Sequence, residues 1–112
     1  MIAQMRRAEV YRNGVLAGIL AEFNRNSYLF RYDDSYFNDT NKPAISLTLS
    51  KRQKEYQSDH MFPFFSNMVA EGANLAIQSR YLKIDERDTL GLLVATASND
   101  SIGPITFKLI EP

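Results

Sequence analysis

Side chains that could carry out catalysis are few and scattered in this sequence. The single histidine, His60, has no cysteine nearby and no His-x-x-x-His or His-Glu-x-x-His spacing, so it predicts a surface or capping residue rather than a metal ligand. Asp33 and Asp34 are adjacent in a polar stretch, where neighbouring carboxylates diverge, which favours a turn or helix cap over acid–base chemistry. No serine lies in a Gly-x-Ser-x-Gly elbow. We therefore expect a protein that is not an enzyme and holds no metal.

The composition excludes several other kinds of chemistry. The five glycines are isolated, without the Gly-x-Gly-x-x-Gly or Gly-x-x-x-x-Gly-Lys clusters that cradle phosphates, so no cofactor is expected. The sequence has no cysteine, which excludes disulfides and thiolate chemistry and permits a reducing compartment. Residues 1–7 place their arginines after the apolar residues, the reverse of a secretory signal peptide. A cytoplasmic protein without membrane contact is expected.

One basic cluster leaves an alternative open. The run from Lys51 to Lys54 holds three cations in four residues, and Arg6 and Arg7 could lie near it. Across all 112 residues, however, 13 basic side chains balance 13 acidic ones, whereas phosphate-binding proteins are expected to carry a basic excess. The cluster therefore favours a solvated loop, so that direct nucleic-acid contact is not expected, and leaves a DNA-associated accessory role as the alternative.

The first third of the chain alternates apolar and polar residues, as half-buried antiparallel strands do. The expected strands share this alternation and lie at residues 8–12, 15–21, 28–32, 45–49 and 105–109. Asn13-Gly14 predicts a type I′ hairpin turn, because both of its central residues must adopt positive φ. A second turn is expected at 24–26, and the polar stretch 33–43 predicts a loop with one helical turn.

After Lys51 the apolar spacing changes to three and four residues, which predicts helices. Three are expected, at about 59–71, 73–82 and 89–97. Ser58 or Asp59 could cap the first and Asp85 or Asp88 the third, while Tyr81 is expected on the buried face of the second. Strands followed by helices and a final strand predict a single α+β domain over residues 1–112. Its antiparallel sheet would combine an N-terminal meander with a C-terminal strand, with about three helices on one face.

Phenylalanines gather at the start of the first expected helix. Phe62, Phe64 and Phe65 fall within four residues, and a helix has one core-facing stripe, so at least one of the three is expected to face away from the core. The alternative is that the segment from Asp33 to Lys54 covers all three. Phe62 is the one most compatible with a core position. Because interfaces favour exposed aromatic and methionine side chains, this end of the helix predicts a contact region for a partner.

Several segments carry motifs in a fixed order. They are Val10-Tyr11-Arg12-Asn13-Gly14 with Gly18, Phe30-x-Tyr32 with Asp33, Ile45-Ser46-Leu47-Thr48-Leu49, Phe62 to Gly72, Asp88 to Val94, and Asp100-x-x-Gly103-x-x-x-Phe107. These segments resemble the N-terminal subdomain of HipA-type toxin kinases, including its V-Y-x-N-G hairpin and its F-x-N-L-L-P-E-G signature. The resemblance spans about Arg6 to Ile110, and Ala70 stands where the family usually has proline.

The resemblance implies a function through a partner. HipA kinases continue into a catalytic part that this sequence, ending at Pro112, does not contain, so it is similar to the small HipS-type antitoxins of tripartite HipBST toxin–antitoxin systems. Such an antitoxin would bind and inhibit a separate HipT-like serine/threonine kinase, in a larger complex with a HipB-like helix-turn-helix DNA-binding protein. Inhibition by occlusion of the ATP site and by distortion of a kinase loop both remain open. The expected contact residues are Phe64, Phe65, Asn67, Met68, Glu71, Gly72, Ala73 and Asn74.

Overall fold

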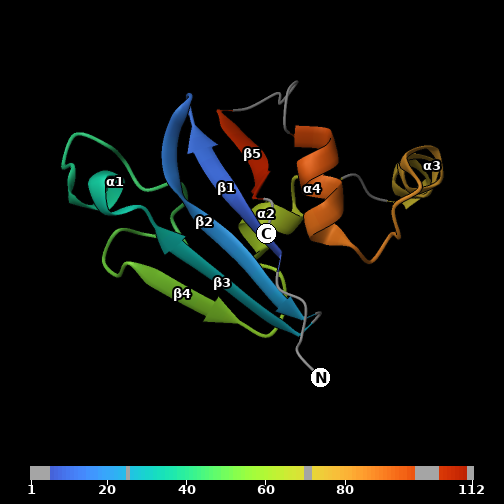
Figure 1. Cartoon of the computed structure of the whole chain (residues 1–112), viewed down its shortest axis with the longest axis horizontal. Coiled ribbons are helices and arrows are strands. Elements are labelled where there is room, and N and C mark those ends of the chain that lie inside the picture. Colours follow the sequence, from blue (N-terminus) through green and yellow to red (C-terminus); the bar gives the residue numbers. More distant parts are fainter. Residues whose placement is uncertain (1–5, 25, 70–71, 98–103, 111–112) are drawn as a thin grey trace.

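The protein folds around one antiparallel sheet, as expected from the sequence (Figure 1). The computed structural model describes residues 6–24, 26–69, 72–97 and 104–110. The strands are β1 (Arg6–Arg12), β2 (Val15–Asn24), β3 (Ser27–Tyr32), β4 (Glu55–Ser58) and β5 (Ile105–Ile110). They are arranged in the order β4-β3-β2-β1-β5, and every neighbouring pair is antiparallel. The N-terminal meander with a returning C-terminal strand is therefore confirmed.

Local sequence explains how the first two strands are joined. Asn13 and Gly14 have φ angles of 51° and 79°, the positive values that a type I′ turn demands, and they join β1 to β2. The last strand returns to lie beside the first, with Val10 opposite Phe107. The first and last strands thus lie side by side, and β5 forms the edge of the sheet next to β1.

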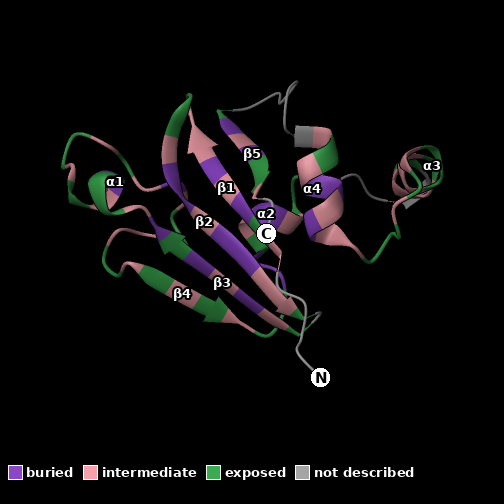
Figure 2. Ribbon diagram, in the orientation of Figure 1, coloured by how far each residue is buried: buried purple, intermediate pink, exposed green. Residues whose placement is uncertain are grey.

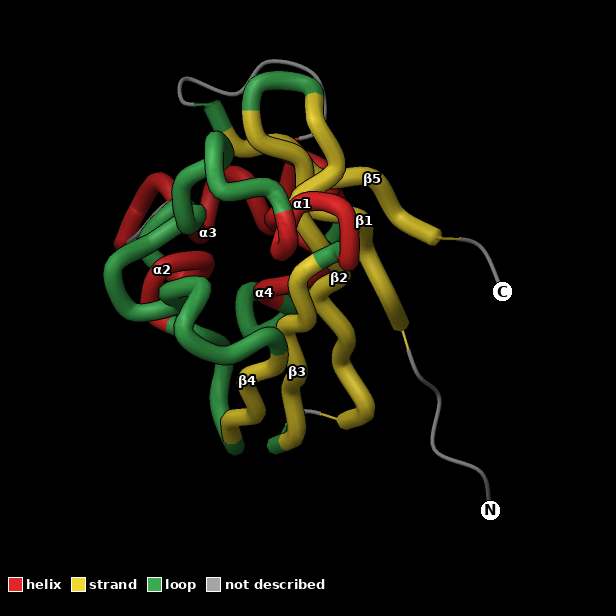
Figure 3. The backbone as a smooth tube through the Cα atoms, turned by 90° about the vertical axis from the view of Figure 1, so that its left-hand side faces the viewer, coloured by secondary structure: helices red, strands yellow, loops and turns green. Residues whose placement is uncertain are grey.

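Four helices accompany the sheet. They are α1 (Asp34–Asn38), α2 (Pro63–Ser66), α3 (Gly72–Leu82) and α4 (Thr89–Ala97). The Asp33 side chain accepts hydrogen bonds from the backbone N–H groups of Ser35 and Tyr36, which confirms its capping role at α1. Figure 3 shows α2, α3 and α4 on one side of the sheet. Within the described ranges no helix has the length and apolar character needed to span a membrane.

The core lies between this side of the sheet and the helices. Figure 2 shows buried residues along the central strands and on α2 and α4, whereas the described side chains of α3 are all intermediate or exposed. The largest fully buried side chains are Tyr32, Phe30, Phe65, Phe107, Leu20, Leu90, Leu92, Leu93 and Val10. The sheet and α4 therefore form the stable centre, and α3 stands outside it.

Residues 45–49 do not form the strand that their alternation predicts. They make bends and turns, closed by a hydrogen bond from the backbone N–H of Leu49 to the carbonyl of Ser46 at 3.2 Å. The Tyr32 hydroxyl accepts from the backbone N–H of Ile45 at 3.1 Å and donates to the carbonyl of Leu49, which pins both ends of the segment to β3. The alternation here buries Ile45 and Leu49, the two residues bonded to Tyr32, and leaves Leu47 between them 99% exposed.

On the side of β3 away from β2, the strand that pairs with it is instead β4, which sequence analysis missed. Its four residues, Glu-Tyr-Gln-Ser, form a short edge strand with no fully buried residue. The long helix expected from about residue 59 is also wrong, because α2 is a single turn that begins at Pro63. Neither Ser58 nor Asp59 caps it; Phe62 is the N-cap residue and makes no side-chain cap. The proline fixes the start of the helix, and the chain leaves the helical path after Ser66.

Candidate partner-docking surface

The segment after α2 turns away from the core in small hydrogen-bonded steps. The backbone N–H of Asn67 donates to the carbonyl of Pro63 at 2.9 Å, and that of Met68 donates to the carbonyl of Phe65 at 3.1 Å. These short turns direct the side chains of Asn67 and Met68 outward, and Met68 is 37% exposed. Two of the expected contact residues are thus accessible to a partner.

The three phenylalanines divide differently from the expectation. Phe62 is buried, as expected, and Phe65 is fully buried with an exposure of 0%. The Phe65 ring lies 5.7 Å from Phe30, 5.7 Å from Phe107 and 5.2 Å from Phe64, measured between centroids. Phe65 is therefore the aromatic centre of the core, and the expectation that it offers its ring to a partner does not fit this burial. Phe64 packs on the core from outside and stays half-buried.

Helix α3 presents apolar side chains that sequence analysis did not expect at the surface. Ile77 is 65% exposed and Tyr81 is 85% exposed, so the expectation that Tyr81 is buried is wrong. Asn74, Ile77 and Tyr81 are spaced by three and four residues and therefore share one helix face, and Asn74 is also exposed. That spacing is the sequence signal that could have identified this face. We call Asn74, Ile77 and Tyr81 the α3 face.

The two ends of α3 are described to different extents. At the C-terminal end of α3, Lys83 adopts φ 59°, the left-handed conformation that often ends a helix. The backbone N–H of Ile84 donates to the carbonyl of Ser79 at 3.0 Å, and the Ser79 hydroxyl donates to the carbonyl of Ile84. At its N-terminal end, Glu71 lies outside the described residues, and only the helical backbone of Gly72 and Ala73 is described. The bonds between Ser79 and Ile84 thus fix how α3 ends.

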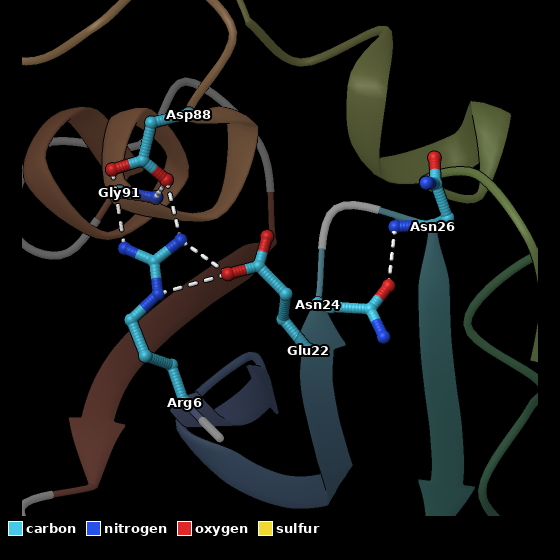
Figure 4. A network of polar contacts seen from close by, with 6 residues as sticks. All are labelled: Arg6, Glu22, Asn24, Asn26, Asp88 and Gly91. Atoms are coloured by element: carbon cyan, nitrogen blue, oxygen red, sulfur yellow. Dashed lines mark hydrogen bonds and ion pairs between the residues drawn. The ribbon is translucent and has the colours of Figure 1, made fainter. Parts of the chain in front are cut away.

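Figure 1 shows α3 on the far side of α4 from the strands, so the position of α4 bears on where α3 stands. An ion-pair network joins α4 to the sheet (Figure 4). The Arg6 guanidinium donates to Asp88 at 2.5 and 3.1 Å and to Glu22 at 2.5 and 2.9 Å. These carboxylates, Asp88 first, raise the pKa of Arg6, so its charge is fixed.

Asp88 has a second role at the start of α4. One of its carboxylate oxygens accepts a hydrogen bond from the backbone N–H of Gly91 at 3.1 Å, which confirms the expected cap. A Cβ atom at position 91 would lie 2.4 Å from the other oxygen of this carboxylate, so glycine is required for the cap and the Arg6 contact to coexist. One carboxylate therefore sets both the start of α4 and its attachment to the sheet.

The basic residues that favour the DNA-associated alternative are largely occupied within the chain. Lys51 Nζ donates to the carbonyls of Asp39 at 2.7 Å and Lys42 at 2.8 Å, and Lys54 pairs with Asp34. Arg6 is held by the network described above. A cation committed to internal acceptors contributes little to phosphate binding, so these contacts weaken the alternative.

The structure offers no catalytic constellation in the part of the chain that it describes. No group of three or more histidine, aspartate or glutamate side chains comes close enough there to hold a metal ion. His60 is exposed and contacts the neighbouring Asp59 at 2.7 Å. What the described residues do offer is accessible apolar surface at Met68 and on the α3 face, which can bind but carries no acid, base or nucleophile arranged for reaction.

Comparisons with known proteins agree with this fold. An uncharacterized protein of Haemophilus influenzae is 28% identical over 95 residues, which are 85% of each of the two chains. The solved N-terminal domain of HipA toxin superposes with a TM-score of 0.71 at 24% identity, covering 99% of this chain and 98% of that domain. The family model for the HipA N-terminal domain matches residues 8–108. The chain belongs to the HipA N-terminal domain family.

Proposed function

We propose that this protein is a HipS-type antitoxin, which binds a separate HipT-like serine/threonine kinase and inhibits it. The observation that carries the proposal is the family match over residues 8–108, which assigns the chain to the HipA N-terminal domain family. A domain that packs against a catalytic partner keeps a complementary surface when the two are separate chains, because interdomain interfaces resemble those between proteins.

The exposed apolar side chains support the same proposal. Met68, Ile77 and Tyr81 are large and accessible, and aromatic and methionine side chains are enriched at protein interfaces. Asn67 and Asn74 lie beside them in the sequence and can supply hydrogen bonds at the rim. We place kinase contact on Phe64, Asn67, Met68, the junction at residues 71–73 and the α3 face. Phe65 would act indirectly, by supporting Phe64 from the core.

Calorimetric titration of the protein into a HipT-like kinase tests this proposal. Tyr81→Ser and Met68→Ser should each weaken binding about 5- to 100-fold, as truncations at the centre of interfaces do. Leu47→Ser is the matched control, because Leu47 is equally apolar and 99% exposed but lies in the loop between α1 and β4. Absence of binding by the wild-type protein would reject the function; equal binding by all variants would reject only the placement of the contact.

Kinase assays then distinguish the two mechanisms of inhibition. If the bound domain occludes the ATP site, raising the ATP concentration should restore activity, whereas distortion of a kinase loop should lower the maximal rate at any ATP concentration. The proposal includes a HipB-like DNA-binding protein in the full complex, so the three purified proteins should elute together in size-exclusion chromatography. Elution of this protein apart from both would contradict it.

A further inference from the structure

The sheet has a second face, opposite to α2, α3 and α4, that no described helix covers (Figure 3). The strand register places one residue from each strand in a single row across this face. In spatial order the row is Lys108, Glu9, Ile19, Arg31 and Glu55. The charges therefore read positive, negative, neutral, positive, negative. The central position is apolar and partly exposed, and the positive positions and Glu55 are exposed.

The neighbouring row carries a single charge. In the same spatial order it is Ile110, Arg7, Ala21, Leu29 and Gln57. Ala21 is only 4% exposed, so the apolar surface at the middle of the face comes from Ile19 and Leu29, which are partly exposed, and the charged residues Arg7, Glu9 and Arg31 lie beside it. An apolar centre with a polar rim is the arrangement found in protein interfaces.

The row of charges is complementary to itself. A two-fold axis parallel to β2, lying between two such faces, sets the row against its own reverse. Ile19 then faces Ile19 of the second copy, Glu9 faces its Arg31, and Lys108 faces its Glu55. Both ion pairs occur twice in such a dimer, and no like charges meet. Because all four flanking positions are charged, any other distribution of their signs that did not reverse in this way would place at least one like pair together.

We propose that this sheet face binds the same face of a second copy of the chain, forming a two-fold symmetric dimer. Sheets packed face to face in this way lie about 10 Å apart with their strands nearly aligned. Five strands spaced about 4.8 Å apart and about 20 Å long offer roughly 400 Å² per copy. The total of roughly 800 Å² for the two copies lies below the range of about 1,200–2,000 Å² typical of stable specific interfaces, so the dimer should be weak and salt-sensitive. It uses a different face from the proposed kinase contact and does not depend on it.

Charges within one copy do not satisfy the row by themselves. Arg31 Nη1 lies 3.8 Å from Glu55 Oε1, a long contact between side chains that are 55% and 42% exposed. The Glu9 carboxylate accepts a hydrogen bond from the Tyr11 hydroxyl at 3.0 Å. Both groups can therefore engage a second copy without giving up a strong internal partner.

Sedimentation velocity of the full chain at low salt, over about 10 to 500 µM, tests the proposal at concentrations suited to a weak interface. The wild type should shift from monomer to dimer, and Glu9→Arg or Arg31→Glu should each remove the shift. In a mixture of the two variants, position 9 of one copy again meets the opposite charge at position 31 of the other, so the mixture should dimerise. Arg52→Glu, which reverses an exposed cation in a loop outside the face, should dimerise like the wild type.

A second pair of variants guards against misfolding. Lys108→Glu and Glu55→Lys should likewise be monomeric alone and dimeric when mixed, and circular dichroism identifies any variant that has lost its fold. A wild-type protein that stays monomeric throughout overturns the proposal. So does failure of both mixtures to recover, or loss of the dimer in Arg52→Glu. If all four variants still dimerise, the dimer contact lies on another surface or does not depend on these charges. Either result overturns the proposal as well.

Discussion

Helices α2 and α3 are neighbours in the sequence and both carry large apolar side chains, yet the fold treats them in opposite ways. In α2, Phe65 is fully buried and contacts aromatic rings from β3 and β5. In α3, Ile77 and Tyr81 are largely exposed, although the helix is longer. The difference shows that apolar character alone does not separate core from interface here.

What separates them is how each helix meets the sheet. Phe62 and Phe65 are three residues apart, so a single turn is enough to direct both rings at the sheet. Among the described residues, no strand lies against the α3 face in this way, because α3 stands beyond α4 (Figure 1). A chain that leaves two large apolar residues in water loses the stabilisation that burying them would give, about 1.5–3 kcal/mol for each. Such a loss is expected where a partner covers the face.

Truncation on the α2 side of this comparison should have the largest effect. Phe65→Ala removes a fully buried ring from the centre of the aromatic cluster and leaves a cavity, so the free energy of unfolding should fall by about 3–5 kcal/mol. Urea denaturation followed by circular dichroism measures this. Phe64→Ala is the control, because Phe64 is half-buried and should lose less than half as much. A loss below about 1 kcal/mol for Phe65→Ala would remove it from the core.

The second prediction concerns the aromatic core near β3. Burial raises the pKa of the Tyr32 hydroxyl to about 12. Between pH 10 and 12 the unfolded chain therefore ionises this group while the folded protein does not, and stability falls as pH rises through that range. Two pKa units correspond to about 2.7 kcal/mol over the whole range, of which about half is lost between pH 9 and pH 11. Urea denaturation at pH 9 and pH 11 measures the loss, which Tyr32→Phe should reduce. Equal slopes in the two proteins would show that Tyr32 is not the group responsible.

Much of the architecture was predictable from sequence because its signals are local. The Asn13-Gly14 turn needs only two residues, and the Asp33 and Asp88 caps need only the few residues that follow them. Residues 45–49 were mispredicted because their alternation serves two anchors held by Tyr32, a contact 13 and 17 residues away in the sequence. Tyr81 was mispredicted for a related reason, since its exposure depends on where α4 places α3.

The third prediction tests the junction that sets the position of α4. Asp88→Ala removes both the cap on Gly91 and the contact with Arg6, and should cost about 1–2 kcal/mol. Asp88→Asn keeps an oxygen for the cap but loses the charge, so it should cost about half as much. Thermal unfolding of the two variants compares these contributions. If Asn were as damaging as Ala, the ion pair would dominate and the cap would contribute little.

The smallest effect on stability should come from the α3 face. Ile77→Ser and Tyr81→Ser alter side chains that are 65% and 85% exposed, so each should change the free energy of unfolding by no more than about 0.5 kcal/mol. The same substitutions should weaken kinase binding. Truncation at Phe65 would therefore lower mainly the free energy of unfolding, whereas truncation at Tyr81 would lower mainly the affinity for the kinase. Leu82→Ser is the control on the same helix, because Leu82 is only partly exposed and should destabilise more than either. A marked loss of stability in Tyr81→Ser would mean that α3 packs on the domain in solution, and the contrast between the two helices would not hold.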